Sequence, residues 1–110
     1  MKLGVYTALL SNLPLGEALH YLQMRGIHVV EIGCGGYSGV FHADPDILLQ
    51  DENALRQFQA TLEKHQMQIS ALNCSGNPIH PQKTIATSFH QAYEKGVLLA
   101  EQLGVDTVIT

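Results

Sequence analysis

Short apolar runs alternate with longer amphipathic stretches along the chain. The runs have the length of strands and are rich in valine, isoleucine and leucine. We expect strands at residues 3–7, 27–32, 68–74 and 105–110. The four runs are mostly apolar on both faces, which is typical of buried parallel strands rather than of an amphipathic antiparallel sheet.

The stretches between these runs carry apolar residues at helical spacing. The first helix should begin near residues 12–14 and end at Gly26. The second should follow Asp51, a good N-cap, and end near residues 64–65, and the third should cover about residues 84–103 and stop at Gly104. The apolar faces that should cover the sheet are Leu15, Ala18, Leu19 and Leu22, then Leu55, Phe58 and Leu62, then Ile85, Phe89, Ala92, Leu99 and Leu103.

Two features depart from a plain alternation of strands and helices. Gly96 lies inside the third helix, where glycine costs about 1 kcal/mol relative to alanine, so we expect close packing against a neighbour there. The loop over residues 33–50 is too long to be a simple connector. Its apolar residues favour an ordered loop, and its length suggests a functional one.

The alternation predicts an α/β fold with parallel strands joined by right-handed crossovers. Ligand-binding residues should then collect in the loops that leave the carboxyl ends of the strands. The 110 residues fit one domain, whereas a complete strand-helix barrel normally needs about 250. Length alone would therefore suggest a small open sheet.

Charge and composition narrow the class of partner. The chain has six Lys and Arg against ten Asp and Glu, a formal charge of −4, and no basic run, so we expect no nucleic-acid partner. Its apolar runs are far shorter than the ~20 residues of a membrane span and no secretion signal is recognisable, so a cytoplasmic location without membrane association is expected. Cys34 and Cys74 are interpreted as reduced thiols.

Three loops at the carboxyl ends of the strands carry the candidate chemistry. They hold Tyr6 and Thr7, then residues 33–37 (GCGGY), then residues 74–81 (CSGNPIHP). Glycines there would let a ligand approach the backbone, although glycine also serves tight turns. The glycines do not complete the G-x-G-x-x-G pattern of dinucleotide-binding folds, and no phosphate-binding Gly-Lys-Ser or Gly-Lys-Thr occurs.

Glu31 and two histidines stand out among the ionisable residues. Glu31 interrupts an apolar strand, so it either faces a polar interior or is paired with a neighbour. His42 and His80 lie in the functional-side loops and could reach a ligand or metal, or simply form hydrogen bonds within the loops. The remaining histidines, expected at the surface, are His20, His28, His65 and His90.

Four segments carry a resemblance to a known family. They are residues 1–7 (MKLGVYT), residues 29–33 with 35–37, residues 75–81 (SGNPIHP) and residues 99–108 (LAEQLGVDTV). The chain resembles the N-terminal half of the sugar phosphate isomerase/epimerase family, which shares the xylose isomerase-like TIM barrel with the endonuclease IV group. The resemblance implies that residues 1–110 form one domain, the first half of a (β/α)8 barrel, which ends after its fourth strand.

The resemblance also implies a function. The complete barrel would hold a divalent metal (Mn, Mg, Co or Zn) that polarises a sugar, while carboxylates move a proton between adjacent carbons. The family's metal ligands follow later strands, so no catalytic residue carries over and the chain alone should hold no metal and be inactive. The endonuclease group places a histidine ligand after its third strand, which leaves His80 a minor possibility. The implied substrate-binding residues are Tyr6, Glu31, Gly33, Cys74, Asn77 and His80.

Three alternatives stay open beside a metal-dependent isomerase or epimerase acting on a small carbohydrate. One is a non-catalytic half-barrel that forms a homodimer through its two exposed sheet edges. Another is part of an endonuclease IV-like hydrolase, which the negative charge disfavours. A third is an open flavodoxin-like sheet, although the first strand lacks the clustered acids of a phospho-acceptor domain and no flavin phosphate loop is recognisable.

Overall fold

The computed structural model describes residues 1–110 and confirms the alternation of strands and helices. The strands are β1 (Gly4–Tyr6), β2 (Val29–Gly33), β3 (Gln68–Asn73) and β4 (Val108–Ile109). The α-helices are α1 (Leu15–Gln23), α2 (Pro45–Leu48), α3 (Glu52–Lys64) and α4 (Lys83–Leu103). Two short 3₁₀ helices follow the first two strands, η1 (Thr7–Leu10) and η2 (Gly36–Ser38).

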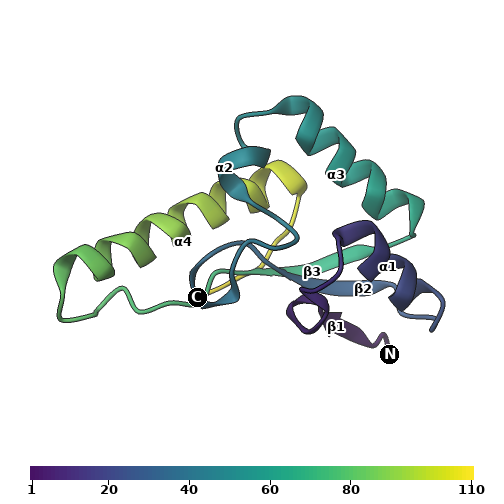
Figure 1. The fold of residues 1–110 in the computed structure, drawn as a ribbon, viewed down its shortest axis with the longest axis horizontal. Coiled ribbons are helices and arrows are strands. Elements are labelled where there is room, and N and C mark those ends of the chain that lie inside the picture. Colours follow the sequence, from purple (N-terminus) through teal and green to yellow (C-terminus); the bar gives the residue numbers. More distant parts are fainter.

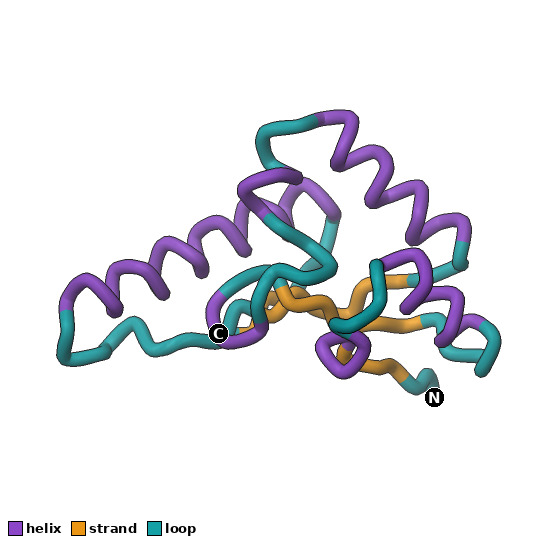
Figure 2. The backbone as a smooth tube through the Cα atoms, in the orientation of Figure 1, coloured by secondary structure: helices purple, strands orange, loops and turns teal.

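The strands form one parallel sheet in the sequential order β1-β2-β3-β4. Crossovers of one hand between successive neighbours place every connecting helix on the same face of a sheet. Figure 1 shows this arrangement, with α1, α3 and α4 on one side of the strands, and Figure 2 shows the strands as a separate layer beneath them. A flavodoxin-like sheet has the order 2-1-3-4-5 and helices on both faces, so the observed winding differs from that alternative.

The hydrophobic core lies between the helices and the covered face of the sheet. The buried side chains of α1 and of β2, among them Leu19 and Ile32, are fully enclosed. The third strand and α4 complete the core with Leu72 and Leu99, which are also fully enclosed. The expected apolar faces of α1 and α3 therefore cover the sheet, as do Leu99 and Leu103 of α4. The first half of α4 does not reach the sheet core, and its expected members Phe89 and Ala92 lie against Gly76 and Gly35 in the loops after β3 and β2.

Local signals set the start of α3 and the end of α4. Asp51 caps α3 by accepting hydrogen bonds from the backbone N–H groups of Asn53 and Ala54. Gly104 ends α4 in the left-handed conformation, with φ of 68°. Because Val105 then donates back to the carbonyl of Ala100, the fourth strand begins later than expected and contains only Val108–Ile109.

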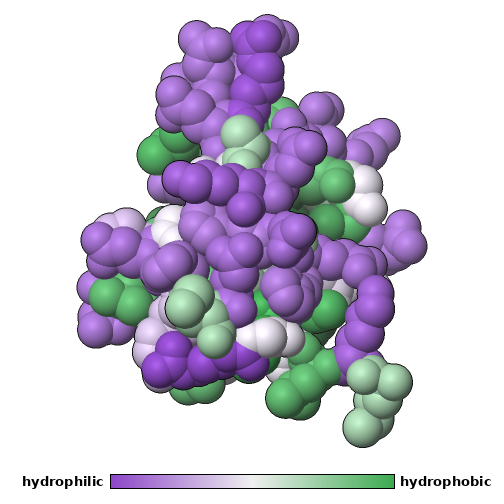
Figure 3. All heavy atoms as spheres, turned by 90° about the vertical axis from the view of Figure 1, so that its right-hand side faces the viewer, coloured by the Kyte–Doolittle hydropathy of each residue, from purple (hydrophilic) through white to green (hydrophobic).

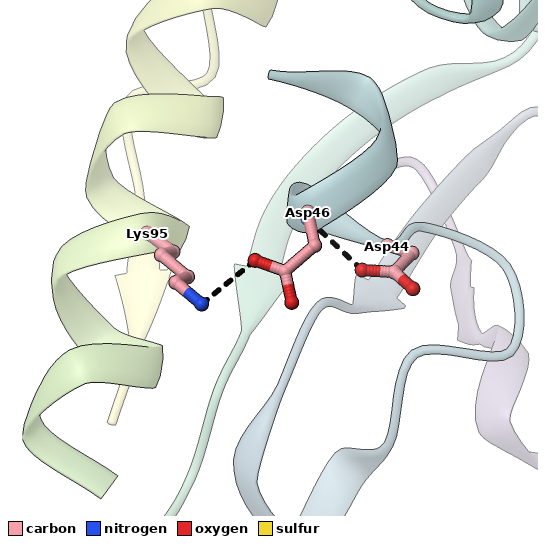
Figure 4. Close-up of polar contacts among 3 residues, drawn as sticks. All are labelled: Asp44, Asp46 and Lys95. Atoms are coloured by element: carbon pink, nitrogen blue, oxygen red, sulfur yellow. Dashed lines mark hydrogen bonds and ion pairs between the residues drawn. The ribbon is translucent and has the colours of Figure 1, made fainter. Parts of the chain in front are cut away.

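The long loop is ordered, as expected, but it contains elements that the pattern did not show. Besides η2, it contains the one-turn helix α2, which Asp44 caps and in which Pro45 occupies the first turn. Lys95 of α4 forms an ion pair of 2.7 Å with Asp46, whose own N–H donates to Asp44 (Figure 4). The ion pair links α2 to α4 at the surface, whereas the bond to Asp44 belongs to the cap of α2 itself.

One expectation about the histidines is wrong. His65 was expected at the surface, but it is buried between α1 and α3. Its Nδ1 lies 2.8 Å from the carbonyl oxygen of Thr61, and its ring meets that of His20 edge to face. A histidine at a helix C-terminus can bond back to a carbonyl of the last turn in this way, and the packing of α1 then covers it. His20, His28 and His90 are exposed.

Candidate functional site

The strand register places polar side chains on the face of the sheet that no helix covers. Val5, Val30 and Leu72 pack into the core, and side chains alternate along a strand. Their neighbours Tyr6 and Glu31 therefore face the other side, where the two are register partners. This uncovered face carries the candidate site at its carboxyl end.

A bulge in β3 brings Asn73 to the same face. The pairing passes from Val30 opposite Ile69 to Glu31 opposite Ala71, which leaves Ser70 as the extra residue. The extra residue reverses the alternation from that point, so Leu72 enters the core and Asn73 faces the site. Without this bulge, the asparagine would point at the helices.

Asn73 is the centre of the hydrogen-bond network at this site. Its Nδ2 donates to Glu31 Oε2 at 2.8 Å. Its Oδ1 accepts from Ser38 Oγ at 2.6 Å, and from both the backbone N–H and the hydroxyl of Ser75, at 2.9 and 2.7 Å. One buried side chain thereby joins β2, the loop after β2 and the loop after β3.

Glu31 has one oxygen held and one available. Its carboxylate is half-buried, and Oε1 has no hydrogen-bond partner in the protein while remaining accessible to solvent. The expectation that Glu31 is paired with a neighbour is confirmed by its bond from Asn73. A fixed carboxylate with a free oxygen can accept hydrogen bonds from the hydroxyl groups of a ligand.

The two glycine-rich loops beside this network contact each other through their backbones. Tyr37 N–H donates to Ser75 O at 2.7 Å, and Cys34 N–H donates to Asn73 O at 2.8 Å. Gly36 has φ of +61°, and a Cβ there would lie 2.2 Å from the carbonyl oxygen of Ser75. Glycine is therefore required where the loops meet, as well as serving the turn.

The sequence-predicted residues divide into two groups. Tyr6 and Glu31 are brought together on the uncovered face, and Gly33 leaves room for Ser38, whose Cβ would lie 2.9 Å from a Cβ at Gly33. Cys74 faces the opposite way, toward α4. Asn77 and His80 are half-buried in the loop after β3, where Asn77 O accepts from His80 N–H and His80 Nδ1 accepts from the N–H of Gln82.

Sequence reasoning missed Asn73, Ser38 and Ser75, which form the centre of the network. One signal was available, because an asparagine that ends an apolar strand beside a strand glutamate is an expected hydrogen-bond partner for that glutamate. The bulge that turns Asn73 toward Glu31 left no recognisable sign in the sequence.

His42 fixes the loop after β2 to the segment that follows β1. It is buried, with Nδ1 3.0 Å from Thr7 Oγ1 and Nε2 2.8 Å from the carbonyl oxygen of Leu13. The carbonyl can only accept, so Nε2 carries a hydrogen. Both ring nitrogens are occupied, which makes His42 a structural residue of the loop.

Replacing His42 with alanine should lower the free energy of unfolding by about 1–3 kcal/mol, because Thr7 and the Leu13 carbonyl would lose their partner in a buried setting. Urea denaturation followed by circular dichroism measures the loss. His80→Ala is the matched control and should cost less than about 0.5 kcal/mol, since that side chain makes one local bond. Equal losses in the two variants would contradict the role given to His42.

The two thiols lie on the covered face under Gly96. A Cβ at Gly96 would lie 3.1 Å from Cys74 Sγ and 3.3 Å from Cys34 Sγ, which confirms the close packing expected there. Both thiols are free and buried. Burial, and then the neighbouring Cys74, raise the pKa of Cys34 to about 12, and burial also raises the pKa of Cys74. The neutral thiols are therefore packing groups rather than nucleophiles.

This raised pKa predicts a loss of stability in alkali. The folded protein holds Cys34 protonated while the unfolded chain ionises above its ordinary pKa of 9.0, so this contribution to stability is complete below pH 9 and declines toward pH 12. The expected slope is up to about 1.4 kcal/mol per pH unit from this residue. Urea denaturation across this range measures it, and Cys34→Ala should flatten the slope. An unchanged slope in that variant would contradict the assignment.

No group of three or more His, Cys, Asp and Glu side chains is placed to hold a metal ion. Within the loops, His42 is fully engaged and His80 is bonded to Gln82. The residues of this chain therefore do not fit the divalent metal that the resemblance implies. No helix is long and apolar enough to cross a membrane.

The opposite end of the sheet, where the strands begin, has no comparable network. Figure 3 shows that end as a largely hydrophilic surface with small, separate apolar patches. His28 Nδ1 meets the carbonyl of Gln66 there, in an exposed contact. In strand-helix barrels, this end contributes stability and the carboxyl end binds ligands.

Comparison with known proteins gives one informative relative. The chain is 38% identical over 109 residues to the uncharacterized protein YfiH of Bacillus subtilis (strain 168). The match covers 99% of this chain and 34% of YfiH, so the chain spans about a third of the length of that relative. No family model matches the chain.

Proposed function

We propose that this chain is the substrate-side half of a metal-dependent sugar or sugar phosphate isomerase or epimerase with a (β/α)8 barrel. The observation that carries the proposal is the Glu31–Asn73 network at the carboxyl end of the uncovered sheet face. In a closed barrel this face becomes the interior, and ligands bind at its carboxyl end.

The winding of the sheet supports the barrel. Sequential parallel strands with all helices on one face leave the other face to be buried by something else. Barrels bury it by continuing the same winding until the last strand pairs with the first. The 110 residues supply four of the eight strands that such a barrel uses, and the relative YfiH is long enough to contain the remainder.

The chemistry of the site supports a polyhydroxylated ligand. The free oxygen of Glu31 accepts hydrogen bonds, and the Tyr6 side chain lies on the same face beside it. A hydroxyl-rich sugar offers the donors that such a carboxylate needs. We assign Glu31 a binding role, because its free oxygen can accept hydrogen bonds while Asn73 orients the carboxylate through the other oxygen.

The metal would be held by residues outside this chain. When bound, a divalent metal would polarise the carbonyl and hydroxyl of the sugar and so ease proton transfer between adjacent carbons. In this chain, Glu31 would accept hydrogen bonds from the sugar, and Asn73 would keep that carboxylate oriented.

A chimera tests the proposal. This chain replaces the matching segment of YfiH, and the product is assayed for sugar isomerisation and epimerisation with added Mn²⁺, Mg²⁺, Co²⁺ or Zn²⁺. The chimera should be active and the 110-residue chain alone inactive, and Glu31→Gln in the chimera should lower kcat/KM about 10- to 100-fold. Glu17→Gln, at an exposed position on α1, is the control and should leave activity unchanged.

Two results would contradict the proposal. Turnover by the isolated 110-residue chain would refute the claim that the metal ligands needed for catalysis lie outside it. Absence of any sugar activity in both YfiH and the chimera, across aldoses, ketoses and their phosphates, would refute the function.

A homodimer is the second candidate. In the sheet, β1 pairs only with β2, and β4 pairs only with β3, so two backbone edges are unpaired. A two-fold pairing of copies through these edges would satisfy them. Light scattering after gel filtration distinguishes the two states, and a folded monomer at micromolar concentration excludes this candidate.

A further inference from the structure

Tyr37 is an exposed aromatic residue that is fixed in place. It belongs to η2 and its side chain is 70% exposed. Its ring packs on that of Phe89, with centroids 4.9 Å apart and planes inclined by 53°. A ring that leaves most of its apolar surface in water contributes little to the core, so its rigid placement needs another reason.

The support for Tyr37 comes from two elements, α4 and the loop after β3. Phe89 of α4 packs on the loop after β3 at Gly76, where a Cβ would lie 2.3 Å from the ring. The backbone N–H of Tyr37 is bonded to Ser75 O at 2.7 Å. Helix α4 therefore restricts the ring, and the loop after β3 restricts the backbone that carries it.

The ring is also connected to the candidate site through its neighbour in the chain. Ser38 directly follows Tyr37 and donates to Asn73 Oδ1 at 2.6 Å, and Asn73 in turn donates to Glu31. The same network that fixes the carboxylate therefore fixes the segment that carries the ring. The Tyr37 ring and the Glu31 carboxylate therefore belong to segments that one hydrogen-bond network connects at the carboxyl end of the sheet.

We infer that Tyr37 is a stacking platform for the apolar C–H face of a sugar ring. The hydroxyl groups of the same sugar would donate hydrogen bonds to Glu31. This inference rests on the proposed function and names a specificity residue for the same site. Sugars present an apolar ring face beside hydroxyl edges, so a fixed aromatic ring that the Ser38–Asn73 hydrogen bond links to the Glu31 carboxylate offers a group for each part. The tyrosine hydroxyl is dispensable for such stacking, whereas the ring is not.

The test measures binding of D-fructose and D-glucose to the 110-residue chain by saturation-transfer NMR and titration in the millimolar range. Tyr37→Ala should weaken binding about tenfold and abolish saturation transfer to the sugar C–H protons, while Tyr37→Phe should retain both. Tyr21→Ala removes another exposed tyrosine, on α1, whose ring is covered by the Arg25 guanidinium, and should leave binding unchanged.

The outcomes separate this inference from the proposed function. If the wild-type chain binds and Glu31→Gln weakens binding while Tyr37→Ala does not, the platform is refuted and the proposed site stands. If the wild-type chain binds neither sugar nor their phosphate esters, the proposed site is refuted together with the platform. Circular dichroism of each variant checks that the fold is retained.

Discussion

Replacing Asn73 with alanine should lower the free energy of unfolding by about 2–4 kcal/mol. The substitution leaves four groups without their partner: the Glu31 carboxylate, the Ser38 hydroxyl, and the N–H and hydroxyl of Ser75. Each loss in this partly buried network costs more than an exposed hydrogen bond would. Urea denaturation measures the change.

Asn77→Ala is the matched control, because Asn77 is half-buried and its side chain makes no hydrogen bond that the network depends on. It should cost less than about 0.5 kcal/mol. Comparable losses for Asn73→Ala and Asn77→Ala would contradict the central place given to Asn73.

Asn73→Asp provides a second test through its pH dependence. The new carboxylate would lie where Nδ2 now donates to Glu31, so two like charges would share one site and the pKa of one carboxyl would rise in the folded state. A raised folded pKa stabilises the protonated form at low pH, so the deficit relative to the wild type should grow as pH rises from 4 to 7. A deficit that does not vary with pH would contradict this geometry.

Replacing Gly36 with alanine should have the largest effect of any single methyl group at this site. Gly36 has φ of +61°, and its Cβ would lie 2.2 Å from Ser75 O and 2.9 Å from Cys74 O, both of which are backbone atoms. The left-handed conformation alone costs about 1–2 kcal/mol, and the contact forces the two loops apart. We expect a total loss above about 3 kcal/mol and weaker ligand binding.

Gly26 offers a matched control, since its φ is +75° and no atom lies within 4 Å of the position of a Cβ. Gly26→Ala should cost only the conformational term, about 1–2 kcal/mol. Thermal or urea denaturation of both variants measures the difference. If the two alanine variants lose the same stability, then the contact between the two loops is not tight.

The parts of the fold that depend on local signals were predictable. Asp51 and Gly104 mark helix ends because a side-chain cap and a left-handed residue act within one turn of the chain. Gly96 predicted close packing because a glycine inside a helix costs stability, and the structure places the sulfur atoms of Cys34 and Cys74 where a larger residue would meet them. The parallel sheet follows from the alternation itself.

The parts that depend on register and tertiary contact were not predictable. The bulge at Ser70 decides that Asn73 rather than Leu72 faces the site, and its sequence carries no turn signal. Burial of His65 depends on how α1 packs against α3. Of the predicted site residues, Tyr6, Glu31 and Gly33 could be grouped because strand ends share an edge, whereas the direction of Cys74 required the structure.

The central claim is that the carboxyl end of the uncovered sheet face binds a sugar. The most direct measurement is a titration of the isotope-labelled chain with D-fructose, followed through the backbone amide signals in NMR. The account predicts shifts centred on Glu31, Ser38 and Asn73 that saturate with ligand and weaken in Glu31→Gln. Saturable shifts confined to the opposite end, around His28 and Gln66, or no shifts at all, would contradict it.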